Sequence, residues 1–301
     1  VPSAFVLFPS PPPRLPVHFH FDPASTWRKA VSAPILRVEN VAKRFVTATG
    51  TVEALAATSI DVREGEFVAV IGPSGCGKST LFNIIGGLES ADGGRVLVGG
   101  TPIDGSHRDI GMVFQEESTF PWRTVVENVA FPLEVAGMGR RAREDKAMRF
   151  VRLVGLDGFE RRYPAELSGG MRQRTALART LCAEPRILLM DEPFAALDEQ
   201  TRMLLGEKLI EICQALKQTT LLITHNLSEA VQLSDRVLVM SFRPGRIKRT
   251  VAIDLPRPRT SDVIASERFA SYLGTIWEDL KAEAAKGLAA LETARRAPAG
   301  R

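Results

Sequence analysis

The sequence predicts an α/β fold built on a mostly parallel sheet that is covered on both faces. Four short apolar runs are typical of buried strands, and stretches with helical periodicity separate them. These strand-like runs occupy residues 66–72, 186–192, 219–225 and 235–241. Because a helix between two strands returns the chain to the same edge of the sheet, the alternation favours parallel pairing.

An antiparallel β subdomain is expected just ahead of the first apolar run. Residues 36–45 and 51–62 both have strand character, and the short turn between them permits a hairpin. Eight of the 19 prolines fall within residues 1–34, so we expect an irregular N-terminal extension before the ordered chain.

An α-helical subdomain is expected at about residues 116–172. The pattern from 125 to 183 is helical, with breaks at residues 137–139 and 163–164. After the last apolar strand, residues 243–255 are strand-like and begin with a Pro-Gly turn.

Residues 259–301 are expected to form a helical C-terminal extension, which leaves residues 35–258 as the main domain. From position 262 onward, large apolar side chains recur on one helical face. They belong to Phe269, Leu273, Ile276, Trp277 and Leu280.

Composition excludes the fibrous, disordered and disulfide-scaffold classes. With 301 residues, 45% hydrophobic and 25% charged, the chain can bury a sizeable core. The 39 Lys and Arg against 35 Asp and Glu give a net charge of +4. That charge is too small to indicate nucleic acid or an anionic membrane as a partner.

The cysteines and the hydropathy pattern favour a reducing cytosol. Cys76, Cys182 and Cys213 are odd in number and form no Cys-x-x-Cys pair, so neither a disulfide framework nor a zinc site is indicated. No run approaches the roughly 18 apolar residues of a membrane span. Any membrane contact is therefore expected to come through a partner.

A glycine-rich motif predicts a phosphate-binding loop. Residues 72–80, GPSGCGKST, fit the pattern G-x-x-x-x-G-K-[ST] between a strand and a helix, which makes the core that of a P-loop NTPase. Lys78 is expected to reach the β- and γ-phosphates of ATP, and the Ser79 hydroxyl to bind Mg²⁺. The expected nucleotide contacts are Gly72, Pro73, Ser74, Gly75, Cys76, Gly77, Lys78, Ser79 and Thr80.

Cys76 has two interpretations. Its place in this loop, near a helix N-terminus, favours the thiolate and hence reaction with alkylating agents. Alternatively, it is a small residue that fits the loop and has no reactivity of its own.

Two acids end the strand-like run at 187–192. Asp191 is expected to order Mg²⁺, and Glu192 to polarise the attacking water. Acids after a strand are often only helix caps or solvated residues, but the phosphate loop in the same chain favours the catalytic interpretation.

The segment 167–180, LSGGMRQRTALART, distinguishes between families of P-loop proteins. Ser168 is expected to cap a helix while the amides of Gly169 and Gly170 face an anion. At this point the sequence resembles the ATP-binding-cassette (ABC) ATPases, whose hallmark is an LSGGQ-like signature. Met171 stands where the family more often has Gln.

This resemblance implies roles for four further residues. Gln115 would contact Mg²⁺ or water and link to a transmembrane subunit, and His225 would contact the γ-phosphate. Asp198 would act across a dimer interface, and Phe45 would stack on adenine. The alternatives are a structural histidine at 225 and a plain strand aromatic at 45.

The resemblance covers roughly residues 35–258, and its branch is that of the nitrate, sulfonate and taurine importers. Residues 120–138 and 241–259 and the helix with Trp277 resemble that branch. It implies a head-to-tail pair, with ATP between one phosphate loop and the other copy's Ser168. Transmembrane permease subunits and, indirectly, a periplasmic solute-binding protein would complete the importer at the cytoplasmic face of the inner membrane.

Other functions make different demands on the sequence. An ABC transporter ATPase for another solute, or for export, remains open. A soluble ABC ATPase of DNA repair or translation is expected to have two cassettes or a long coiled-coil insertion, and the sequence shows neither. A GTPase is expected to have the guanine-binding motif N-K-x-D, but the chain has no Asn-Lys pair.

A cluster of basic residues late in the main domain invites a nucleic-acid interpretation. It lacks an aromatic stacking platform, so we expect a solvated hairpin face and no nucleic-acid partner. Its members are Arg243, Arg246, Lys248, Arg249, Arg257 and Arg259.

Overall fold

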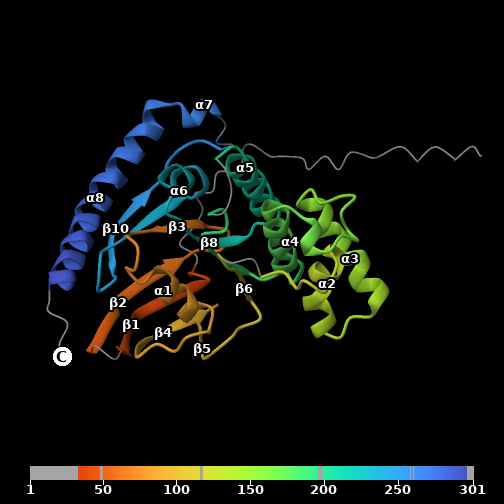
Figure 1. Cartoon of the computed structure of the whole chain (residues 1–301), viewed down its shortest axis with the longest axis horizontal. Coiled ribbons are helices and arrows are strands. Elements are labelled where there is room, and N and C mark those ends of the chain that lie inside the picture. Colours follow the sequence, from red (N-terminus) through yellow and green to blue (C-terminus); the bar gives the residue numbers. More distant parts are fainter. Residues whose placement is uncertain are drawn as a thin grey trace, which may run out of the picture. The chain divides into compact units, whose positions relative to one another are not determined.

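The structure is a computed structural model that describes residues 33–47, 50–115, 118–195, 199–257, 259 and 261–296. Residues 1–32 of the expected N-terminal extension lie outside the described residues. The described chain forms two sheets and several helices (Figure 1).

The larger sheet confirms the predicted parallel architecture. Its order is β10-β9-β3-β8-β7-β6, and all neighbours pair in parallel except β10, which runs antiparallel to β9. The strands are β3 (Phe67–Ile71), β6 (Ile110–Val113), β7 (Ile187–Asp191), β8 (Thr219–Ile223), β9 (Arg236–Met240) and β10 (Ile247–Ala252).

The smaller sheet is the expected antiparallel one, with two strands that the sequence pattern did not predict. Its order is β2-β1-β4-β5. The strands are β1 (Leu36–Thr47), β2 (Gly50–Val62), β4 (Gly93–Val98) and β5 (Thr101–Ile103).

Helices connect the strands and cover the parallel sheet. The predicted breaks at 137–139 and 163–164 fall between α2 and α3 and at the start of η1, as expected. The helices are α1 (Lys78–Ile85), α2 (Val125–Val135), α3 (Arg140–Leu153), the short 3-10 helix η1 (Pro164–Glu166), α4 (Gly169–Cys182), α5 (Glu199–Ala215), α6 (Leu227–Leu233), α7 (Ser261–Ile264) and α8 (Glu267–Arg296).

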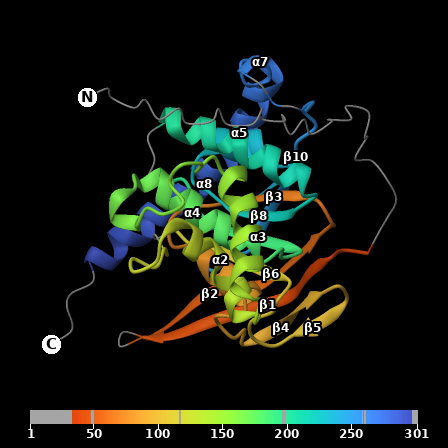
Figure 2. The ribbon, with the colours of Figure 1, turned by 90° about the vertical axis from the view of Figure 1, so that its right-hand side faces the viewer.

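Strand β3 is buried on both faces, which fixes the start of the phosphate loop. Val68 and Val70 pack with α1 and the antiparallel sheet, whereas Ala69 and Ile71 pack with α6 and α8. Figure 2 shows the antiparallel sheet on one side of the parallel sheet and α5 on the other. Burial of each valine contributes about 1.5–3 kcal/mol to stability.

Helices α2, α3 and α4 form a group at one end of the parallel sheet (Figure 1). Helix α2 begins with a capping box, in which Thr124 and Glu127 each accept from the other's backbone N–H. These helices lie in the predicted helical subdomain, whose limits at about 116 and 172 stay a prediction.

Helix α8 buries most of the face that the sequence predicts. Phe269 and Ile276 are buried, and Leu273 and Leu280 pack beside them. Trp277 is a correction, because its side chain is 53% exposed. Adjacent helical residues point about 100° apart, so the turn that buries Ile276 directs Trp277 toward the edge of the packed face.

Candidate active site

The phosphate loop joins β3 to α1 and depends on two glycines in left-handed conformations. Gly75 has φ +72° and Gly77 has φ +102°, values that side chains disfavour. A Cβ at Gly77 would also lie 2.7 Å from the carbonyl oxygen of Ala54 in β2. Helix α1 starts without a side-chain cap, so its first amides remain available to an anion.

Lys78 lies over the loop that precedes it. Its ammonium donates to the carbonyl oxygens of Gly72 at 2.9 Å and Pro73 at 3.1 Å, and the residue is only 8% exposed. Together with Ser79 and Thr80 it forms the first turn of α1. The loop therefore concentrates positive charge and amide donors at one place.

The structure corrects the reactive interpretation of Cys76. The residue is fully buried, and burial raises the pKa of its thiol, although the nearby Lys78 ammonium opposes that shift. The effect of desolvation on the pKa of this thiol is larger than the opposing effects of the helix N-terminus and the Lys78 ammonium. Cys76 therefore fits the loop as a small, mainly protonated residue.

Ser79 and Asp191 meet beside the loop. Burial raises the pKa of Asp191, and a hydrogen bond from the Ser79 hydroxyl partly offsets this shift. The arrangement places a carboxylate and a hydroxyl, two hard oxygen donors, at the carboxyl end of β7.

Three predicted residues come together at the carboxyl ends of neighbouring strands. The Glu192 carboxylate lies 3.4 Å from the amide nitrogen of Gln115 and 3.1 Å from Nδ1 of His225. These residues follow β7, β6 and β8, which are adjacent in the sheet. Parallel strands end at the same edge, so residues far apart in sequence converge there.

Glu192 has an unusual backbone. Its φ is +46°, and its N–H donates to the carbonyl oxygen of Ile223 at 2.9 Å. A left-handed conformation at a residue other than glycine costs on the order of 1 kcal/mol and is concentrated at functional sites. The sequence pattern gives no indication of this turn.

A buried acid behind His225 was missed by the sequence interpretation. Glu229 is 8% exposed and accepts a hydrogen bond from the Thr224 hydroxyl, and burial raises its pKa. Asn226 caps the same helix by accepting from the Glu229 N–H at 3.1 Å. The available signal was an acid four positions after the histidine, one helical turn away.

The remaining predicted residues lie apart from this cluster. The Ser168 side chain caps α4 by accepting from the Met171 N–H, as predicted, and Gly169 and Gly170 open that helix. Phe45, near the end of β1, is 37% exposed. Asp198 lies outside the described residues.

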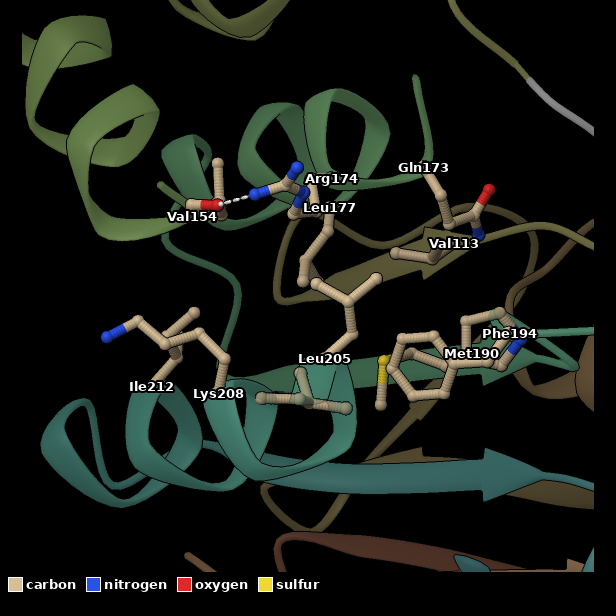
Figure 3. Close-up of a pocket in the computed structure, with 12 residues that line it drawn as sticks. Val113, Val154, Gln173, Arg174, Leu177, Met190, Phe194, Leu205, Lys208 and Ile212 are labelled. Atoms are coloured by element: carbon tan, nitrogen blue, oxygen red, sulfur yellow. Dashed lines mark hydrogen bonds between the residues drawn. The ribbon is translucent and has the colours of Figure 1, made fainter. Parts of the chain in front are cut away.

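An apolar cavity of about 20 Å³ lies between α4, α5 and strands β6 and β7 (Figure 3). Leu177, Met190 and Leu209 help to line it, and Arg174 on its rim donates to the Val154 carbonyl oxygen at 3.2 Å. Such a volume has room for about one water molecule. It is too small for a nucleotide.

The expected solvated basic face is wrong for two of its members, Arg257 and Arg259. Arg259 is 4% exposed and donates to the carbonyl oxygens of Val231, Gln232, Ser234 and Ile253. Arg257, whose side chain is 15% exposed, pairs with Asp235 at 2.7 Å. Arg243 is exposed, as expected, and donates to the Gly75 carbonyl oxygen at 2.7 Å.

Comparison with known proteins identifies the family. The sequence profile described as ABC transporter matches residues 55–195. An uncharacterized ABC transporter ATP-binding protein of Methanocaldococcus jannaschii is 49% identical over 253 residues, which are 84% of this chain and 94% of that protein. The chain belongs to the ABC transporter family. As a member, it is an ATPase that couples ATP hydrolysis to transport.

Other relatives of this ABC transporter ATPase carry more specific names. An aliphatic sulfonates import ATP-binding protein of Bacillus cereus is 44% identical over 75% of this chain and 88% of its own. A nitrate import ATP-binding protein of Synechocystis is 47% identical over 73% of this chain and 83% of its own.

A solved structure confirms the fold of this ABC transporter ATPase. A dimeric, post-hydrolysis ATP-binding cassette bound to ADP and Pi has a TM-score of 0.66 and 31% identity, and the alignment covers 72% of this chain and 98% of that one.

Proposed function

We propose that this chain is the ATP-hydrolysing subunit of an importer for a small anion such as nitrate, an aliphatic sulfonate or taurine. The relatives named for nitrate and aliphatic sulfonate import, at 47% and 44% identity, support this branch. The alternative is the same ATPase role in a transporter for another solute. The cluster of Gln115, Glu192 and His225 beside the phosphate loop carries the catalytic part of the proposal.

The loop and the start of α1 bind the phosphates of ATP. Their backbone amides and the Lys78 ammonium, which the loop carbonyls already hold in place, face the negative charge. Phe45 offers an exposed ring on which adenine stacks.

The residues beside the loop fit Mg²⁺. Ser79, Asp191 and Gln115 supply oxygen donors, which this ion prefers, and the buried Asp191 carboxylate gains a counter-charge. Among the described residues no group of three or more His, Cys, Asp or Glu is placed to hold a metal, so the nucleotide's phosphates complete the site. When bound, Mg²⁺ neutralises charge on the β- and γ-phosphates.

Glu192 accepts a proton from the attacking water. Its carboxylate lies between Gln115 and His225. The left-handed backbone conformation of Glu192 turns the chain away from the direction of β7. His225, whose side chain is 60% exposed, donates a hydrogen bond to the γ-phosphate. Thr224 and Glu229 fix the turn that carries His225.

Two copies assemble head to tail around ATP. Ser168, Gly169 and Gly170 open α4 with amides that favour an anion, which in the dimer is the nucleotide of the other copy. The dimeric neighbour at 31% identity supports this arrangement. Asp198 is proposed to act across the same interface.

Aromatic side chains near Gln115 form a surface suited to the permease. Trp122 is 71% exposed and Phe114 is 40% exposed, and the Phe120 ring lies 5.7 Å from that of Trp122. Exposed aromatics of this kind mark protein interfaces. No helix among the described residues is long and apolar enough to cross a membrane. In line with the relatives named for import, we assign membrane attachment at the cytoplasmic face to the permease, and solute delivery to a periplasmic binding protein.

Transport by the reconstituted complex tests the proposal. The chain is combined in proteoliposomes with the permease and the solute-binding protein that it is proposed to serve. Uptake of labelled nitrate, taurine and an alkanesulfonate is then measured with ATP inside. We expect ATP-dependent uptake of one of these anions, and none with Glu192→Gln. Uptake of none of them, with intact ATPase activity, would reject the solute class.

A further inference from the structure

The turn between β9 and β10 lies against the phosphate loop. Arg243 in this turn donates from Nε to the carbonyl oxygen of Gly75 at 2.7 Å. Gly245 lies so near the loop that a Cβ there would collide with the carbonyl oxygen of Cys76. The turn therefore contacts two consecutive peptide groups of the loop.

Hydrogen bonds hold this turn in one conformation. The Ser241 hydroxyl donates to the Pro244 carbonyl oxygen at 3.0 Å and accepts from the Arg246 N–H at 3.2 Å. The Gly245 N–H donates to the carbonyl oxygen of Ala54 in β2 at 2.9 Å. Arg243 thus reaches the loop from a fixed base.

Helix α8 holds the turn through a buried glutamate. Glu283, 1% exposed, accepts from the Phe242 N–H at 2.9 Å and pairs with Lys248 at 3.2 Å and Lys286 at 2.8 Å. Burial alone would raise the pKa of Glu283, but these three partners lower it to about 2. At Gly287 a Cβ would come within 3.1 Å of the Phe242 ring, so the helix and the turn are in close contact.

The contact at Gly75 orients an amide of the loop. The Gly75 carbonyl and the Cys76 N–H belong to one planar trans peptide and point in opposite directions. In the structure that N–H points into the loop and donates to the Pro73 carbonyl oxygen at 3.3 Å. The amides of such a loop bind phosphates. When Arg243 holds the Gly75 carbonyl on the outer side of this peptide, it therefore also fixes the direction of the Cys76 N–H on the inner side.

We propose that Arg243 is a positioning residue for ATP binding, and that α8 sets the affinity of the phosphate loop through Glu283 and the turn at 242–245. The proposal rests on the proposed function, since the loop must bind ATP. Any change that moves α8 relative to β10 would then alter ATP affinity without touching the nucleotide.

Substitution of Arg243 tests the contact with the loop. In the full chain, titration with a fluorescent ATP analogue should give a Kd about tenfold higher for Arg243→Ala, equal to about 1.4 kcal/mol. The KM for ATP should rise with Kd while kcat changes less. Arg243→Lys should recover only part of the affinity, because an ammonium lacks the planar donor geometry. Arg246→Ala, an exposed cation in the same turn, is the matched control and should bind as wild type.

Substitution of Glu283 tests the link to α8. Glu283→Ala should raise Kd about threefold, a smaller change because it acts indirectly, and Glu283→Gln should recover part of it by accepting from Phe242. Glu278→Ala, an exposed glutamate on the same helix, should have no effect. If Glu283 acts through the turn, Arg243→Ala/Glu283→Ala should bind no more weakly than Arg243→Ala.

The outcomes separate this proposal from the function on which it rests. Unchanged Kd in Lys78→Ala would overturn the phosphate-loop site itself. A weakened Lys78→Ala with unchanged Arg243 and Glu283 variants would overturn only the role of α8 and its turn. Multiplicative effects in the double variant would also overturn it. Melting temperatures without nucleotide are recorded, and all titrations are made well below the lowest of them, so that unfolding cannot imitate a loss of affinity.

Discussion

The phosphate loop holds the Lys78 ammonium in the position where it is proposed to contact ATP. Its ammonium is satisfied by the Gly72 and Pro73 carbonyls and is almost buried, so it is fixed in place before any phosphate arrives. Such preorganised charge lowers the barrier to a reaction because little rearrangement is left for the reacting state.

We expect Lys78→Ala to abolish hydrolysis and to weaken ATP binding. Loss of one preorganised electrostatic contact typically raises a barrier by about 3 kcal/mol, or roughly a hundredfold in rate. Phosphate release and ATP-analogue titration measure the two effects. Turnover near that of the parent protein would contradict the role of the loop.

Cys76 should resist alkylation in the native protein. Burial raises the pKa of its thiol, so less thiolate is present at any given pH than for a free cysteine, and the rise of rate with pH is displaced upward. Labelling with iodoacetamide from pH 7 to 9, read by peptide mass spectrometry, should be slow with and without MgATP. Protein unfolded in denaturant is the control. Equal rates in the native and unfolded protein would contradict the burial argument.

Helix α6 depends on a residue far along the chain. Arg259 donates to carbonyl oxygens at the end of α6 and in the segments beside it, and burial lowers its pKa to about 10, which still leaves it charged at neutral pH. Because α6 begins two residues after His225, at Leu227, this guanidinium stabilises the helix that follows a residue of the candidate site.

We expect Arg259→Met to destabilise the fold by about 3 kcal/mol, because several buried carbonyls lose their donor at once. Thermal unfolding followed by circular dichroism measures the change. Arg246→Met, in an exposed position of the same basic cluster, should melt like the parent. A melting temperature for Arg259→Met equal to that of this control would show that the carbonyls find other donors.

Elements with a strong apolar pattern were predictable from the sequence, whereas the short strands β5 and β6 were not. Strands β3, β7, β8 and β9 are continuous buried runs, whereas β5 is three residues long and mostly exposed, and β6 is a half-buried edge strand. The two acids at the end of a strand-like run predicted Glu192, and the resemblance supplied Gln115 and His225. The contact between Arg243 and Gly75 could not be foreseen, because it depends on the order of strands in the sheet.

At the scale of the whole molecule, the proposed dimer makes the site incomplete in one copy. Gln115, Glu192 and His225 form one cluster, while Ser168 lies at the start of α4 on a different element. In the proposed dimer, ATP joins the loop of one copy to Ser168 of the other, so chemistry and assembly are coupled.

Glu192→Gln should therefore be inactive yet accumulate as an ATP-bound dimer. The amide cannot accept the proton from water, and removal of one negative charge reduces repulsion with the γ-phosphate. Size-exclusion chromatography with MgATP, together with the permease-bound complex, measures assembly. Adding Ser168→Arg should return the protein to monomers, since the larger side chain occupies the space for phosphate. An inactive variant that binds ATP but never dimerises would refute the shared site.

The antiparallel direction of β10 has a topological consequence. Along the carboxyl edge of the sheet, the β9–β10 turn, the phosphate loop, His225, Glu192 and Gln115 follow the order of β9, β3, β8, β7 and β6. A parallel β10 would have required a crossover that carries the chain to the opposite edge before it re-enters. A tight reversal instead leaves the chain beside the nucleotide and sends α8 back along the sheet. Under the proposal made for Arg243 and Glu283, the hairpin gives α8 access to the phosphate loop, so that the helix can control ATP binding without any change in the residues proposed to perform the chemistry.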